Sequence, residues 1–362
     1  MKSMTPVGGP YTHDKVSVGK TMSLVMFALL PATLFGFYLY GWPALILFSV
    51  TVLAAAISEA VCLLIAKKPV LTYLFDGSAV LTGWLLAMSL PPWAPWWIGL
   101  VGAIIAIVIG KQVFGGIGQN LFNPAMVARV ALLISFPFEM TTWVGPQPLF
   151  SAQSPDFAHA LLITFGHATQ LDAVSSATVL GHIKTELSRN IPLSESLGST
   201  YDVLTSTLGF TSGSMGETAS LLVLAGGLFL LFMRIISWHI PFSMIISIAL
   251  LATVFNWIDP QRYADAGVHV FSGATMLGAF FIATDLVTSP VTRLGQVIFG
   301  AGCGLLVFTI RTWAGYPEGM GFAVILMNAL TPLIDHYIRP RIYGRDRKGQ
   351  PVRLQESMGS DK

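Results

Sequence analysis

Long apolar runs alternate with short polar breaks along most of the chain. A run of about twenty apolar residues makes a helix long enough to cross the hydrocarbon core of a bilayer. The pattern predicts about ten such helices, with edges set by Gly, Pro and polar residues. Their expected ranges are 21–41, 43–66, 75–91, 94–113, 122–138, 218–237, 241–258, 270–288, 294–313 and 320–338. We therefore expect an all-α membrane protein.

The composition points to the same surroundings. Hydrophobic residues make up 54% of the chain and charged residues only 10%, whereas soluble globular domains contain roughly 25% charged residues. Spanning segments must satisfy their own backbone groups, so only helices or a closed barrel can cross, and these runs have helix length. A net charge of +2 gives no reason to expect nucleic acid, whereas membrane lipid is an expected partner.

Basic residues indicate the orientation. The first twenty residues are polar and lead directly into a full-length span, which is unlike a cleaved signal peptide. With the N-terminus inside, basic residues gather in the cytoplasmic connections, as the positive-inside rule requires. These are Lys67, Lys68, Lys111, Arg234 and Arg293, followed by a basic tail. We expect a multi-pass protein of the bacterial inner membrane with both termini in the cytoplasm.

The chain divides into five expected parts. A leader (1–20), a first transmembrane repeat (21–140), a large periplasmic loop (141–217), a second transmembrane repeat (218–338) and a cytoplasmic tail (339–362) follow one another. Residues 75–83 align with residues 271–279, and each segment opens the third span of its half. Because five crossings reverse the second copy, the halves are expected to form two inverted five-helix repeats. The alternative is that both segments are only small-residue packing surfaces.

The periplasmic loop contains the sequence Asp172-Ala173-Val174-Ser175-Ser176-Ala177-Thr178. It resembles the signal at which a periplasmic flavin transferase joins FMN to a threonine hydroxyl through a phosphodiester. The resemblance makes Thr178 the acceptor and places Asp172, Ser175, Ser176 and Ala177 at the other motif positions. A threonine hydroxyl needs activation to act as a nucleophile, and small neighbours allow close approach of a modifying enzyme. The alternative is a helix start capped by Asp172 or Ser175.

A second run, Ser272-Gly273-Ala274-Thr275, repeats the last four motif positions. His269 occupies the place of the motif aspartate, and Thr275 opens an apolar span that a soluble transferase could hardly reach. We therefore assign the covalent FMN to Thr178. Ser272, Gly273 and Thr275 are interpreted as a helix start that could approach a second, noncovalent flavin such as riboflavin, or an anion.

Several polar residues lie in or at the ends of apolar spans, where an unpaired charge costs at least about 2.5–3.5 kcal/mol. Two interpretations stay open: a polar lining for ions or a cofactor between the halves, or buried pairs, for example Arg129 with an acidic residue. The segment 118–125 indicates a broken helix with free carbonyl groups. The residues concerned are Glu59, Asp76, Asn120, Asn123, Arg129, Asp285 and Asn328.

The resemblance extends over nearly the whole chain. It includes Pro10-Tyr11-Thr12-His13, the run Gly-Gln-Asn-Leu-Phe-Asn-Pro-Ala-Met at 118–126, the flavinylation loop and the segment 328–335. Together these segments resemble the RnfD/NqrB family. This family contains the D subunit of the Rnf complex, an ion-translocating ferredoxin:NAD oxidoreductase, and the B subunit of the sodium-pumping NADH:quinone reductase. The leader of about twenty residues favours the Rnf type, because the quinone reductase subunit usually has a longer extension.

The resemblance implies a subunit of a redox-driven ion pump that relays electrons through covalent FMN, coupled to Na⁺ or H⁺ movement. The implied partners are the Rnf subunits A, B, C, E and G, which carry the iron–sulfur clusters, the NADH site and a second covalent FMN. The chain lacks a GxGxxG unit and cysteine clusters, so it is not a complete enzyme alone. We assign it no catalytic or metal-ligating residue. The rival classes are a flavin-free transporter or channel and a structural anchor.

Overall fold

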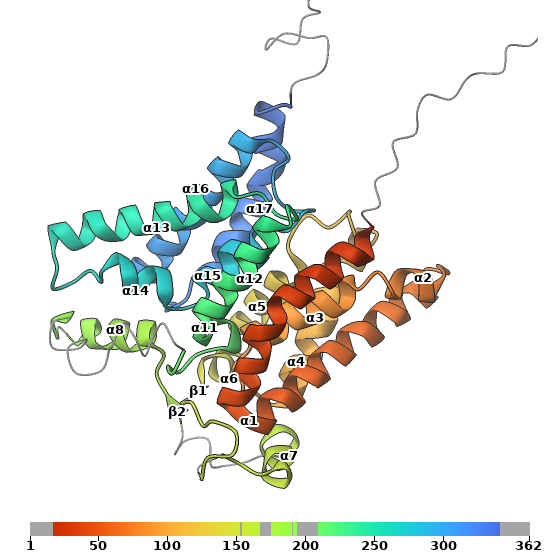
Figure 1. The fold of residues 1–362 in the computed structure, drawn as a ribbon, viewed down its shortest axis with the longest axis horizontal. Coiled ribbons are helices and arrows are strands. Elements are labelled where there is room, and N and C mark those ends of the chain that lie inside the picture. Colours follow the sequence, from red (N-terminus) through yellow and green to blue (C-terminus); the bar gives the residue numbers. More distant parts are fainter. Residues whose placement is uncertain (1–16, 153, 167–174, 190, 194–208, 341–362) are drawn as a thin grey trace, which may run out of the picture.

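The structure, a computed structural model, describes residues 17–152, 154–166, 175–189, 191–193 and 209–340 (Figure 1). Helices dominate these residues. Four helical segments are long and apolar enough to cross a membrane by length and composition: Val18–Ile65, Trp96–Phe114, His239–Ile258 and Arg293–Trp313. Three shorter apolar helices are Ser78–Ser89, Pro124–Ser135 and Ser220–Phe232. The fold agrees with the predicted all-α membrane protein.

The elements follow the predicted order. The first half contains α1 (Val18–Ile65), α2 (Val70–Leu74), α3 (Ser78–Ser89), α4 (Trp96–Ile104), η1 (Ile105–Ile109), η2 (Gln112–Phe114), α5 (Pro124–Ser135) and α6 (Pro137–Thr141). The long connection contains β1 (Trp143–Val144), α7 (Phe157–Phe165), β2 (Ser175–Ser176) and α8 (Val179–Ser188). The second half contains α11 (Met215–Thr218), α12 (Ser220–Phe232), α13 (His239–Ile258), α14 (Ala266–Phe271), α15 (Thr275–Leu277), η4 (Gly278–Ile282), α16 (Arg293–Trp313) and α17 (Met320–Tyr337).

Helix α1 is two helices joined at a sharp kink. Gly41 has φ +72° and ψ −158°, a backbone conformation that is costly for residues with a Cβ atom. The two arms of α1 therefore run in different directions, as the V shape in Figure 1 shows. They coincide with the predicted helices at 21–41 and 43–66, so the sequence break at Gly41 correctly predicted two segments.

The predicted helix at 270–288 is interrupted. Helix α14 ends at Phe271, Ser272 and Gly273 have non-helical backbone, and α15 and η4 follow. Gly273 has φ +68°, and Gly77, its partner in the sequence alignment, has φ +78° directly before α3. Both aligned segments therefore change direction at a glycine in the left-handed region, where only glycine fits without strain.

The two halves meet along several helix pairs, among them α1 with α12 and α5 with α17. Their shared core is built from buried apolar side chains, including Leu29, Met88, Phe280 and Phe299. Gly226 in α12 lies directly against the backbone of Ala28 in α1. Small residues at such contacts let helix backbones approach closely, which is how helices in membranes gain packing energy.

A buried ion pair stabilises the first half. Lys111 Nζ lies 2.9 Å from Glu59 Oε1, and both side chains are at most 3% exposed. Lys111 also donates to Ser78 Oγ at 2.7 Å, and Gln112 Nε2 donates to Glu59 Oε1 at 2.6 Å. Glu59 is thus a paired buried charge, one of the two interpretations that the sequence left open.

Removing one partner of this pair should destabilise the protein. Lys111→Met leaves the Glu59 carboxylate buried without a counter-charge, which costs roughly 3–5 kcal/mol. The double variant Lys111→Met/Glu59→Leu removes both charges and should recover most of that loss. Thermal unfolding in detergent compares the two variants with the parent protein; a single variant as stable as the parent would contradict the expectation.

Candidate functional site around Thr178

Thr178 begins helix α8. Its Oγ1 accepts a hydrogen bond from Gly181 N at 3.1 Å, and the residue is 9% exposed. A threonine in this position satisfies one of the free N–H groups at a helix start. Sequence reasoning had considered Asp172 or Ser175 as the cap, whereas the structure gives this role to the predicted flavin acceptor itself.

The other motif residues lead into this cap. The backbones of Ser175 and Ser176 form β2, which pairs antiparallel with β1 in the register Val144 to Ser175 and Trp143 to Ser176. Ala177 is exposed. Asp172 lies outside the described residues. The strand pair therefore fixes the backbone that leads to Thr178 beside the end of the first half.

Helix α8 is attached to the second half by packing and by one charge. Leu180 and Ile183 pack against Ala264 and Val268, which lie before and within α14 (Figure 1). Lys184 Nζ donates to the carbonyl oxygens of Arg311, Ala314 and Tyr316, at 3.3 Å for Arg311 and 2.9 Å for Tyr316. A cation at the C-terminal end of α16 is favoured by the helix dipole. Burial lowers the pKa of Lys184.

A small cavity brings the two sequence motifs together. Thr178, Ser272 and Gly273 line the same space of about 30 Å³, together with Glu217 and Glu318. This volume holds about one water molecule. Ser272 Oγ is buried and has no hydrogen-bond partner among the described residues. The two motif segments therefore converge in space although they lie far apart in the chain.

Thr275 and Ala274 do not line this cavity. Thr275 is fully buried, and its Oγ1 donates to the carbonyl oxygens of His269 at 2.9 Å and Ser272 at 3.3 Å. Ala274 N donates to Glu318 Oε2 at 3.1 Å. Of the run that the sequence singled out, Ser272 and Gly273 line the cavity, and the N–H of Ala274 is already occupied.

An ion pair binds the non-helical segment at Ser272 and Gly273, between α14 and α15. Arg311 Nη2 lies 2.8 Å from Glu318 Oε2. The guanidinium also donates to the carbonyl oxygens of His269 and Ser272, at 2.7 Å and 3.3 Å. Glu318 Oε1 accepts from Gly319 N and Met320 N at the start of α17. Sequence reasoning selected neither Arg311 nor Glu318; the one hint of this role was a basic residue in the last turn of an apolar span.

A larger cavity adjoins α8. It has a volume of about 580 Å³ and shares Leu180 and Pro317 with the small cavity. Pockets of 300–1,000 Å³ are typical of small-molecule sites. Tyr263 and Trp313 line it with ring centroids 6.4 Å apart, and the Arg262 guanidinium lies 6.0 Å from the Tyr263 ring centroid. Its shape and aromatic wall suit a flat aromatic ligand.

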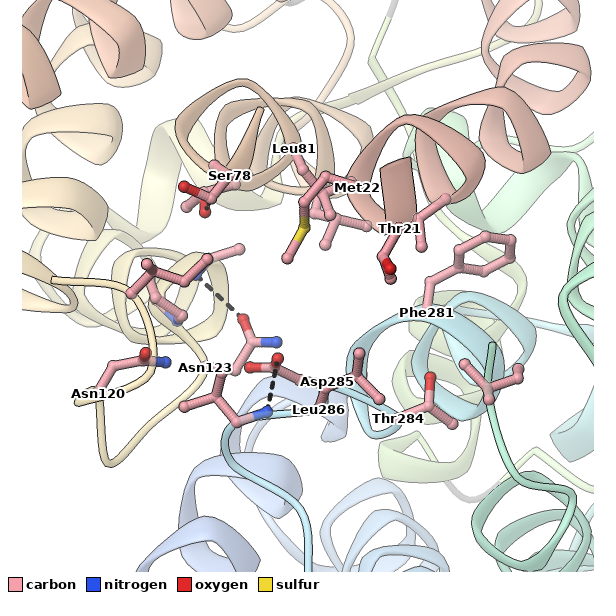
Figure 2. A pocket seen from close by; sticks show the side chains of 18 of the residues that line it. Thr21, Met22, Ser78, Leu81, Asn120, Asn123, Phe281, Thr284, Asp285 and Leu286 are labelled. Carbon is pink, nitrogen blue, oxygen red and sulfur yellow. Dashed lines mark hydrogen bonds between the residues drawn. The ribbon is translucent and has the colours of Figure 1, made fainter. Parts of the chain in front are cut away.

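A third cavity, of about 100 Å³, lies between the two halves at the end opposite α8. Figure 2 shows Asn120 and Asn123 of the first half close to Asp285 of the second half. Asn123 Oδ1 caps α5 through Ala125 N at 3.1 Å, while Asn123 Nδ2 donates to the Ile282 carbonyl oxygen at 3.3 Å. Three of the intramembrane polar residues thus line one space between the halves.

The remaining polar residues have different surroundings. Arg129 lies against Met140 Sδ at 3.7 Å and over the Trp143 ring at 5.9 Å, and it forms no ion pair within the described part of the chain. The expected ion pair of Arg129 with an acidic residue is therefore not found among the described residues. Asp76 caps the start of α3 through Ser78 N at 2.7 Å. The side chain of Asn328 has no hydrogen-bond partner among the described residues.

These features define a helical membrane protein with a capped threonine beside a cavity that the long connection and the second half of the chain build. The chain belongs to the NQR2, RnfD, RnfE family, whose sequence model matches residues 6–344. The resemblance inferred from the sequence is thereby confirmed.

Several relatives match almost the full chain. The D subunit of the ion-translocating oxidoreductase complex of Halorhodospira halophila is 53% identical over 346 residues, covering 96% of this chain and 97% of the relative. The protein of the same name from Stutzerimonas stutzeri is 52% identical over 336 residues, covering 93% and 95%. That of Rhodobacter capsulatus is 50% identical over 316 residues, covering 87% of each chain.

The attachment of α8 through Lys184 can be tested directly. Lys184→Met keeps the length of the side chain and removes the ammonium group, so the hydrogen bonds to the end of α16 are lost at a cost of about 1–2 kcal/mol. We expect the backbone amides of α8 to exchange roughly ten-fold faster, measured by hydrogen–deuterium exchange mass spectrometry. Arg189→Met removes an exposed ion pair with Glu186 and is the matched control. Equal exchange in both variants would contradict a role of Lys184 in attachment.

Proposed function

We propose that this chain is the D subunit of an ion-translocating oxidoreductase complex and relays electrons within it. Support comes from relatives of that name that are 50–53% identical over at least 87% of the chain. The B subunit of the sodium-pumping NADH:quinone reductase is the second candidate, because the family model includes both types. In this function the chain works with the Rnf subunits A, B, C, E and G and moves Na⁺ or H⁺.

The proposal includes covalent FMN on Thr178, attached by a periplasmic flavin transferase. The cap geometry supports it, because Thr178 Oγ1 accepts from Gly181 N and its own O–H is not needed for the cap. The transferase would exchange this O–H bond for an O–P bond while the pyrophosphate bond of a flavin dinucleotide donor breaks and its nucleotide half leaves. The added phosphodiester would lie at the N-terminus of the ten-residue helix α8, where N–H groups and the helix dipole favour an anion. Bound FMN would supply a carrier that accepts and donates one or two electrons.

The neighbouring residues fit such a group. The small cavity at Thr178 is too small for a flavin ring, but the cavity of about 580 Å³ beyond Leu180 is large enough. Tyr263 and Trp313 would offer aromatic contact there, and Arg262 and Lys184 would offer positive charge toward the phosphate and the ring. A flavin-free transporter or a structural anchor would use neither this cavity nor the cap.

We further propose ten membrane crossings in two inverted repeats. The left-handed glycines Gly77 and Gly273 occupy aligned positions, and each precedes the start of a helix. A basic residue near the end of the next long helical segment reaches each start, Lys111 to Ser78 Oγ and Arg311 to the Ser272 carbonyl oxygen. In Figure 1 the beginning of α1 and the end of α17 lie toward the upper side of the view, opposite α7 and the kink of α1. This arrangement favours both termini in the cytoplasm and α8 in the periplasm of the bacterial inner membrane.

Flavin attachment is tested by in-gel fluorescence of the denatured protein, made in cells that contain a flavin transferase. Thr178→Val removes the acceptor hydroxyl and should abolish the fluorescence completely. Thr185→Val alters an exposed threonine of the same helix and should leave it unchanged. Thr275→Val, in the competing run, should also stay fluorescent. A fluorescent Thr178→Val protein, or a wild-type protein without flavin, would overturn the assignment.

Orientation is tested in intact cells with a membrane-impermeant thiol reagent, in a background where Cys62 and Cys303 are replaced by Ala. A cysteine at exposed Thr185 should be labelled, since the proposed topology places α8 outside. A cysteine at exposed Lys67 should be labelled only after the cells are broken. The reverse pattern would place α8 in the cytoplasm and remove the basis for periplasmic flavin attachment.

A further inference from the structure

Two carboxylates line the cavity at Thr178, and their surroundings differ. Glu318 is bound by the Arg311 guanidinium and accepts hydrogen bonds from the backbone N–H groups of Ala274, Gly319 and Met320. The carboxylate of Glu318 thus has a counter-charge and three backbone donors. Glu217 accepts a hydrogen bond from Ser214 Oγ at 2.9 Å and forms no ion pair with the described residues.

The charges around Glu217 come from four elements. The ionised carboxylate of Glu318, before α17, disfavours a second negative charge, while Arg129 of α5 and Arg311 of α16 act in the opposite direction. The Tyr40 hydroxyl of α1 also faces this region. Burial comes first and Glu318 second among the causes that raise the pKa of Glu217 to about 7. Burial and Arg311 lower the pKa of the nearby His269 to about 3, so its imidazole is neutral.

A carboxylate that is paired with a guanidinium thus lies beside a carboxyl group that has no ion pair within the described residues, and two acids in such different surroundings can take different roles. A second observation points to the same cavity. Ser272 lines the cavity and is 5% exposed, and its buried Oγ has no hydrogen-bond partner among the described residues. Ser272, Thr178 and Glu217 therefore surround a space with room for about one water molecule.

We propose that Glu217 is an exchangeable proton site that balances charge at the Thr178 cavity. Its carboxyl group binds a proton from water when negative charge is added beside Thr178 and releases that proton when the charge leaves. The added charge is one electron from an iron–sulfur cluster of a partner subunit, so the coupling rests on the proposed function. For each electron that arrives beside Thr178, Glu217 binds one proton, and for each electron that leaves, Glu217 releases one proton. Proton binding by Glu217 in the absence of flavin does not depend on that function.

Proton binding is tested on the full-length Thr178→Val protein, which separates the site from the flavin. Infrared difference spectra between pH 5 and pH 9 report the C=O stretch of a protonated carboxyl group. We expect such a band with a midpoint near pH 7, lost completely in Thr178→Val/Glu217→Gln and kept in Thr178→Val/Glu186→Gln. Glu217→Asp, which keeps an acid at the site, should restore a band with a shifted midpoint. A band that persists in the Glu217→Gln protein, or no band titrating near neutral pH, overturns the proposal.

Coupling is tested on the intact complex by following the flavin midpoint potential as a function of pH. The parent protein and Glu186→Gln should show an inflection near pH 7, and Glu217→Gln should lose it. Identical profiles in the parent and Glu217→Gln proteins would overturn the coupling. A failure of the proposed function is recognised separately, because Thr178→Val would then still carry flavin.

Discussion

The site depends on how the chain satisfies a break in a helix within an apolar interior. The change of direction at Ser272 and Gly273 leaves carbonyl and N–H groups without helical partners, and each costs several kcal/mol when buried unpaired. Arg311 donates to the carbonyl oxygens of His269 and Ser272, and Glu318 accepts from Ala274 N and from the start of α17. Since the two side chains also pair with each other, one ion pair holds three backbone segments. Its position decides where Ser272 and Gly273 meet Thr178.

In the first half, other residues stabilise the corresponding change of direction before α3. Gly77 turns the chain before α3, and Lys111 reaches Ser78 from the end of the following helical segment while pairing with Glu59. A cationic side chain therefore donates hydrogen bonds to each turn. Lysine binds a hydroxyl in the first half, whereas arginine binds carbonyl oxygens in the second. Arginine suits the second turn because its planar group can donate in several directions at once. Polar groups of the second half, Ser272 and Glu318 among them, line the cavity at Thr178, beside the segment that resembles the flavinylation motif.

Sequence patterns predicted the all-α fold because long apolar runs and glycine breaks are local signals, as the kink at Gly41 illustrates. The motif likewise singled out Thr178, and the internal repeat singled out Ser272 and Gly273. Glu217 and Glu318 were not found, because their significance arises only when segments distant in the chain converge on one cavity. Thr178 as the cap was also missed, since Ser175 and Thr178 have the same capping chemistry and only the strand pairing decides which of them starts α8.

A redox group attached at Thr178, as proposed, would need two kinds of charge compensation, and the surrounding residues offer both. The N-terminus of α8 presents fixed N–H groups that favour a permanent anion such as a phosphodiester. Fixed dipoles cannot follow the arrival and departure of an electron, whereas a carboxyl group poised near neutral pH can, by binding or releasing a proton. Lys184 holds α8 against the end of α16, the helix that carries Arg311. Because Coulomb energies grow as the dielectric falls, the partly buried cavity makes this compensation stronger than it would be in water.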